Sequence, residues 1–148
     1  MLIYIMRSSK VIEPIKQFKN IRELKDCAKW WQKRLFLENW FIKYELVDKQ
    51  LAKESGELID GYCQFSVENK EAKIVISNIQ TEEGVIEFSA ELTLVHELLH
   101  MKREYLSKSY NEGESESFED LLLHQSQEEM AKTLLLIKYG LEKDWFLK

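Results

Sequence analysis

The chain has 148 residues, of which 45% are hydrophobic and 32% charged, and its formal net charge at pH 7 is −5. This length suits a single domain over residues 1–148, and the hydrophobic content excludes an intrinsically disordered chain. The acidic balance argues against broad electrostatic binding to nucleic acid or to anionic membranes, and the apolar runs are far shorter than a membrane span.

The first six residues, Met1 to Met6, are apolar but lack the basic flank and the length of a secretory signal. We therefore expect a cytoplasmic protein. Residues 1–6 form either a short edge strand or, if translation begins at Met6, a dispensable extension of residues 1–5. Cys27 and Cys63 make no C-x-x-C pair. We expect both to be reduced and partly buried, with neither a disulfide nor a cysteine zinc site.

Hydrophobic spacing predicts the elements of the N-terminal half. Pro14 suits the first turn of a long amphipathic helix that ends near Leu37, and its tryptophans are expected in the core. Alternation then predicts a strand over 40–47, a polar connection over 48–58, and strands over 62–67 and 72–77. The turn at 68–70 joins the last two strands as an antiparallel hairpin, and Gly61 marks a tight turn or a bulge.

The C-terminal half is predicted to be mainly helical. Ser89 is the expected N-cap of a helix that ends near Tyr105, and Glu91 in its first turn suits the helix dipole. Residues 107–116 are a predicted surface loop. A final helix runs from near Ser117 to a C-cap at Gly140, and the tail with Trp145 and Phe146 folds back on the core. The fold class is therefore α+β, with a small, mostly antiparallel sheet of three to four strands.

The most specific motif is H-E-x-x-H, which spans His96 to His100. Residues four apart lie one above the other on a helix, so both imidazoles can bind one metal ion. At about 100° per residue, Glu97 falls in the same sector as the histidines. The opposite half of this helix is apolar and contains Leu92, Leu94, Val95, Leu98, Leu99, Met101 and Tyr105.

This arrangement predicts a zinc site. The two histidines bind Zn²⁺, the metal lowers the pKa of a bound water to roughly 7, and Glu97 acts as the general acid/base that moves the water's proton. The alternative is a solvated helix face. We favour the metal site because two of the chain's three histidines lie in the motif, on an amphipathic helix.

A catalytic zinc needs a third protein ligand, and we expect it from the final helix. Glu128 is an acid on an apolar stripe with Ala131 and Leu135, where an unpaired carboxylate would be costly. Glu129 points about 100° away and is the second choice. His124 is an alternative third ligand or oxyanion stabiliser, or simply a core or rim histidine. Tyr105 and Tyr110 are weaker candidates for the oxyanion role.

The residues from Leu37 to Leu136 resemble those of uncharacterised phage and bacterial metallopeptidases of the minimal gluzincin type. The resemblance is carried by H-E-L-L-H at 96–100, by the strand pattern Trp40, Ile42, Tyr44 and Leu46, by Gly61-Tyr62 and Ile74-Val75-Ile76, and by Glu128 with Ala131 and Leu134. It implies a zincin-like domain in which His96, His100 and Glu128 hold zinc and Glu97 is the base. The serine- and glutamate-rich stretch 106–117 and His124 depart from the pattern.

The sequence thus predicts a zinc metallopeptidase that hydrolyses a peptide or protein substrate lying along an exposed sheet edge. The alternative is a non-catalytic, zinc-stabilised phage or bacterial regulatory or interaction module. Such a module would close the fourth metal position with a protein ligand, for which His124 is the residue to test. A nucleic-acid-associated protease is a third interpretation, which only the basic N-terminal helix favours.

Overall fold

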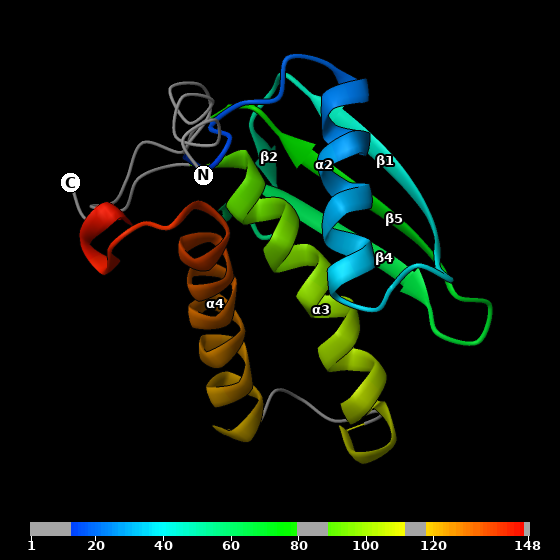
Figure 1. Ribbon diagram of the computed structural model, residues 1–148. Coiled ribbons are helices and arrows are strands. Elements are labelled where there is room, and N and C mark those ends of the chain that lie inside the picture. The colour runs from blue at the N-terminus through cyan, green and yellow to red at the C-terminus, as the bar shows by residue number, and fades with distance from the viewer. Residues whose placement is uncertain (1–12, 80–88, 112–117, 147–148) are drawn as a thin grey trace.

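The computed structural model describes residues 13–79, 89–111 and 118–146, and the polypeptide has an α+β fold (Figure 1). The predicted coarse fold class is therefore confirmed. The described elements are α2 (Ile21–Arg34), β1 (Phe41–Val47), β2 (Leu51–Ala52), β3 (Leu58–Ile59), β4 (Gly61–Ser66), β5 (Glu71–Ser77), α3 (Ala90–Asn111), α4 (Phe118–Tyr139) and a short 3₁₀ helix (Lys143–Phe146).

The main sheet has the strand order β1-β5-β4. Strands β4 and β5 form the predicted antiparallel hairpin, with Cys63 opposite Ile74, whereas β1 pairs with β5 in parallel. The connection predicted to be irregular contains the two-residue strands β2 and β3, which pair antiparallel with each other. Because β5 is central, its Ile74, Val75 and Ile76 are all buried.

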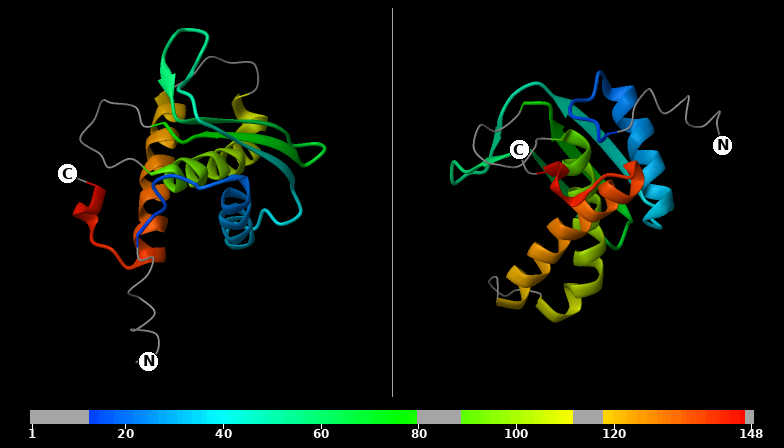
Figure 2. Two further views of the ribbon diagram at one scale, coloured as in Figure 1. Left: turned by 90° about the horizontal axis from the view of Figure 1, so that it is seen from above. Right: turned by 60° about the vertical axis from the view of Figure 1, so that its left-hand side comes forward.

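Helices α2 and α3 cover one face of the sheet, and α4 packs against α3 (Figures 1 and 2). The predicted strand face of Ile42, Tyr44 and Leu46 packs against the core beneath these helices. The buried core includes Phe18, Leu24, Ala28, Trp31, Leu37, Trp40, Ile74, Ile76, Leu94, Val95, Leu98, Met101, Ala131, Leu135 and Phe146. The α3 helix is therefore the central element, in contact with the sheet, α2 and α4.

The N-terminal helix is shorter than predicted, since it begins at Ile21 rather than at Pro14 and ends at Arg34. Asn20 is its N-cap, and the Asn20 side chain accepts a hydrogen bond from the Glu23 backbone N–H. The preceding residues are held outside the helix by Asn78, whose side chain accepts from the Phe18 N–H and donates to the Phe18 carbonyl. These long-range bonds replace the intrahelical bonds that a helix at residue 18 would make.

The α3 helix begins where predicted but ends later than predicted. Ser89 caps α3 as predicted, because its Oγ accepts from the Leu92 N–H at 3.1 Å. The helix then continues to Asn111, so residues 107–111 are helical rather than part of a loop. No glycine or proline occurs there to end it. The rest of the predicted loop, residues 112–116, lies outside the described residues, as do Met1 to Met6.

The end of the chain follows the prediction. Gly140 adopts a φ of 65° directly after α4, as a C-terminal cap requires, and Phe146 is buried in the core. Cys27 is buried and Cys63 half-buried, as expected, and both side chains are free thiols. None of the described helices has the length and apolar character needed to cross a membrane.

Candidate metal centre

The H-E-x-x-H motif lies in the second and third turns of α3. Leu94, Val95, Leu98 and Met101 fix the buried side of the helix, and the half-buried His96 and His100 rings lie one turn apart with centroids separated by 6.4 Å. Glu97 was expected to share the sector of the histidines. Within the motif it is the most deeply buried of the three, with only 7% of its surface exposed.

The environment of Glu97 changes its acidity. Burial raises the pKa of this carboxyl to about 7; the neighbouring His96 opposes the shift and Glu128 adds to it. Glu97 also contributes, after burial, to raising the pKa of the Cys63 thiol on β4 to about 12. A carboxyl group whose pKa lies near neutrality can both accept and return a proton at physiological pH.

The α4 helix brings Glu128 to His96. Glu128 Oε1 lies 2.6 Å from His96 Nδ1, which donates to it. The adjacent Gln127 is 6% exposed, and its Nε2 donates to the His96 backbone carbonyl at 2.9 Å. Ala131, one turn further along α4, is fully buried, which permits the close approach of the two helices. His96 is therefore held through both its ring and its main chain.

The contact with Glu128 also affects His96 electrostatically. Burial lowers the pKa of the imidazole, but the hydrogen bond to Glu128 and the charges of Glu97 and Glu128 outweigh burial and raise it. A metal ligand must be a neutral imidazole, so metal binding here would compete with protonation.

The other predicted site residues are Glu129, His124, Tyr105 and Tyr110. Glu129, the second choice for a third ligand, is exposed, whereas its neighbour Glu128 faces α3. His124 lies within α4, and Tyr105 and Tyr110 lie within α3, but their side chains are outside the described part of the structure. Their suggested roles as a ligand or as oxyanion stabilisers stay predictions.

Comparisons with known proteins identify no relative of this chain. No protein-family model, curated protein or solved structure matches the chain. The resemblance to minimal gluzincins therefore stays an interpretation of residues 37–136, and the case for a metal centre depends on the arrangement of its own side chains.

The side chains of His96, His100 and Glu128 are of the types that bind zinc, but they are not arranged here as a complete set of ligands. Among the side chains that the structure describes, no three from His, Cys, Asp or Glu form a group placed to hold a metal ion. However, two imidazoles one turn apart and a carboxylate from a second helix are the donor types of catalytic zinc sites. In its hydrogen bond to His96 Nδ1, Glu128 suits the acceptor that orients a histidine ligating through Nε2, and as a third ligand its carboxylate would leave this bond.

The structural importance of two buried polar residues, Glu91 and Gln127, was not identified from the sequence. Glu91, expected only to complement the helix dipole, is fully buried and binds side chains of both α2 and α4. Gln127 is also buried, and it donates to the His96 main chain. Glu91 lies one helical turn before the buried Val95, and Gln127 lies one turn before the buried Ala131. A polar residue on the buried face of a helix is the sequence feature that could have identified both.

Proposed function

We propose that this protein is a zinc-dependent metallopeptidase, in which His96 and His100 of α3 and Glu128 of α4 hold the metal. The observation that carries the proposal is the 2.6 Å contact between Glu128 and His96, because it brings an acidic residue of a separate helix to the H-E-x-x-H motif. When bound, zinc supplies a Lewis acid that acidifies water and polarises a substrate carbonyl.

The role of Glu97 follows from its position and its acidity. As general base it takes the proton of the attacking water, and as general acid it then delivers that proton to the leaving amine. Its pKa of about 7 supports this double role. The low exposure of Glu97 keeps bulk water from competing for its carboxylate.

The substrate in this proposal is an extended peptide bound along β4. This strand is at one end of the order β1-β5-β4, and it lies beside α3. The main chain of an edge strand can pair with an incoming peptide by β-augmentation. The electrostatic effect of Glu97 on Cys63 supports the same placement, because it indicates that β4 passes near the proposed base.

Metal analysis of protein purified without a chelator or a histidine tag tests the ligand set. We expect about one zinc ion per wild-type chain, and binding at least tenfold weaker in Glu128→Ala, because a third ligand is lost. Glu129→Ala is the matched control, since the neighbouring acid is exposed, and it should bind as wild type does. Absence of zinc from wild type, even after zinc is offered, would refute the proposal.

Hydrolysis of a peptide library tests the chemistry. Glu97→Gln should retain zinc but lose peptidase activity by at least a hundredfold, because the amide is nearly the same size as the carboxyl and cannot act as the base. Full activity in this variant would show that Glu97 is not the general base.

One observation favours a second candidate, the non-catalytic zinc-stabilised module. Gln127 and Glu128 already link α4 to α3 through His96, so a metal at this point would reinforce a contact between helices. In that case wild type would bind zinc, gain stability from it and hydrolyse no peptide. Its zinc affinity would also fall on His124→Ala, because His124 would be the fourth ligand.

A further inference from the structure

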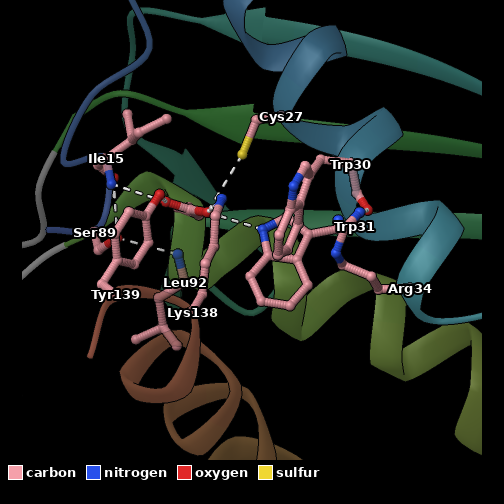
Figure 3. Close-up of polar contacts among 10 residues, drawn as sticks. Ile15, Cys27, Trp30, Trp31, Arg34, Ser89, Leu92, Lys138 and Tyr139 are labelled. Atoms are coloured by element: carbon pink, nitrogen blue, oxygen red, sulfur yellow. Dashed lines mark hydrogen bonds and ion pairs between the residues drawn. The ribbon is translucent and has the colours of Figure 1, made fainter. Parts of the chain in front are cut away.

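The α3–α4 pair has a second polar contact away from the motif, centred on Glu91. Five groups donate to its carboxylate. Oε1 accepts from the Ile15 N–H at 3.0 Å and from the Tyr139 hydroxyl at 2.6 Å. Oε2 accepts from Trp31 Nε1 at 2.8 Å, from Lys138 Nζ at 2.6 Å and from the Cys27 thiol at 3.5 Å. Figure 3 shows these donors converging from α2, from α4 and from the segment before α2.

The cation of this cluster is enclosed by aromatic rings. Lys138 Nζ lies 4.3 Å from the centroid of the Trp30 ring, 5.2 Å from that of Trp31 and 4.8 Å from that of Tyr139. Arg34 stacks on Trp30 at 3.6 Å (Figure 3). The Lys138 side chain is 17% exposed and Glu91 is completely buried. Such an ion pair tolerates little displacement, because moving either partner leaves a charge in an apolar environment.

The cluster is fixed to the body of the protein on one side and to α4 on the other. The main chain of α3 is anchored at this point, since the Glu91 N–H donates to the Ile15 carbonyl and the Ala90 N–H to the Lys16 carbonyl. Trp31 adds a contact from α2. By contrast, α4 packs mainly on α3, so its placement depends on that interface (Figure 1).

We propose that Glu91 and Lys138 are positioning residues that fix α4 against α3, so that Gln127 and Glu128 reach His96. The ion pair fixes how the beginning of α3 packs against the end of α4. Ala131 and Leu135, both fully buried, continue the contact along α4 toward Glu128. The consequence for zinc binding rests on the proposed function, but the effect on the His96–Glu128 contact does not.

The His96–Glu128 contact can be measured without metal. An ionised carboxylate only accepts hydrogen bonds, so His96 donates through Nδ1–H, and this proton should be protected from exchange. With ¹⁵N-labelled histidine, only three imidazoles contribute to the spectrum. We expect one slowly exchanging Nδ1–H resonance, assigned to His96 by its loss in Glu128→Ala.

The deciding variant is the double substitution Glu91→Gln with Lys138→Met. It removes the ion pair without leaving a buried charge unpaired, so the fold is retained. We expect loss or severe broadening of the His96 resonance, with a native far-UV circular dichroism spectrum. Lys132→Met, on the same helix but outside the cluster, is the matched control and should keep the resonance. Retention of the resonance in the double variant, or its absence from wild type, would overturn the inference.

A zinc titration of the same variants separates this inference from the proposed function. If both are right, the double variant binds zinc at least tenfold more weakly than Lys132→Met. If wild type and Lys132→Met bind no zinc but the His96 resonance still depends on the ion pair, the proposed metallopeptidase is wrong and the positioning role stands. If the double variant changes neither the zinc affinity nor the His96 resonance, the positioning role is wrong and Glu91 and Lys138 serve only a structural role.

Discussion

Gly61 begins β4 and lies close to both β5 and α3. A Cβ atom added at this residue would lie 2.8 Å from Thr93 Cγ2 and 2.8 Å from the Val75 carbonyl oxygen. The Thr93 methyl group can rotate away, but the Val75 oxygen is part of β5 and cannot move without disturbing the sheet. The residue predicted to mark a turn or a bulge is therefore required because β4 lies close to the main chain of β5 here, with α3 packed beside it.

Gly61→Ala should lower the free energy of unfolding by about 1–3 kcal/mol, the usual cost of overpacking a core. Urea denaturation measures it. Gly140→Ala is an informative comparison, because a Cβ atom added at Gly140 would meet nothing within 4 Å and only the φ of 65° opposes a side chain. We expect a cost of about 1 kcal/mol there. A Gly61→Ala protein as stable as wild type would contradict the close approach of Gly61 to the Val75 carbonyl oxygen.

At the scale of the elements, α3 depends on the cap at its N-terminus. Ser89 Oγ accepts from the Leu92 N–H and donates to the Ile15 carbonyl at 2.9 Å, so one hydroxyl both caps the helix and holds the segment before α2. The residues that follow form the proposed metal centre. The cap therefore supports both the helix and the position of its first turns.

Ser89→Ala should cost about 0.5–2 kcal/mol of stability, the range observed for lost N-caps. We expect a value in the upper half of this range because the bond to Ile15 is lost as well. Thermal and urea unfolding measure the loss. Ser126→Ala, at an exposed position within α4, serves as the control and should change the free energy of unfolding by less than about 0.5 kcal/mol. Equal effects of the two substitutions would exclude a capping role.

At the scale of the whole molecule, the Glu91 cluster links stability to pH. Burial alone would raise the pKa of Glu91, but hydrogen bonds from Lys138, Tyr139 and the Ile15 N–H outweigh burial and hold the pKa below its ordinary value of 4.5. Between the folded and unfolded pKa values the unfolded chain binds more protons. The ionised carboxylate therefore contributes stability that is fully present above about pH 4.5 and is lost as the pH falls through the folded pKa.

Glu91→Gln tests this linkage. At pH 7 the variant should be less stable than wild type by about 3–5 kcal/mol, because Lys138 is left without its buried partner. The difference should shrink as urea denaturation is repeated at progressively lower pH below 4.5. Glu57→Gln, in an exposed ion pair with Lys53, should differ little from wild type at any pH. A difference between Glu91→Gln and wild type that does not vary with pH would contradict the depressed pKa.

Features fixed by neighbouring residues could be predicted from the sequence. The helical face of His96 and His100, the cap at Ser89 and the helix end at Gly140 each depend on residues within about one helical turn. The β4–β5 hairpin was also predictable, because a short turn determines which strands pair. The choice of Glu128 over Glu129 as the residue facing α3 followed from the apolar stripe of α4.

Only the tertiary structure decided the remaining features, because they depend on residues far apart in the chain. The first helix begins at Ile21 since Asn78, 60 positions away, binds the backbone of Phe18. Strand β1 pairs in parallel with β5 across the segment that forms β2 to β4, and no local pattern specifies that pairing. Glu91 accepts from the Ile15 N–H across 76 residues. The local sequence therefore determined a helix that presents His96, Glu97 and His100, whereas long-range packing determined which groups surround them.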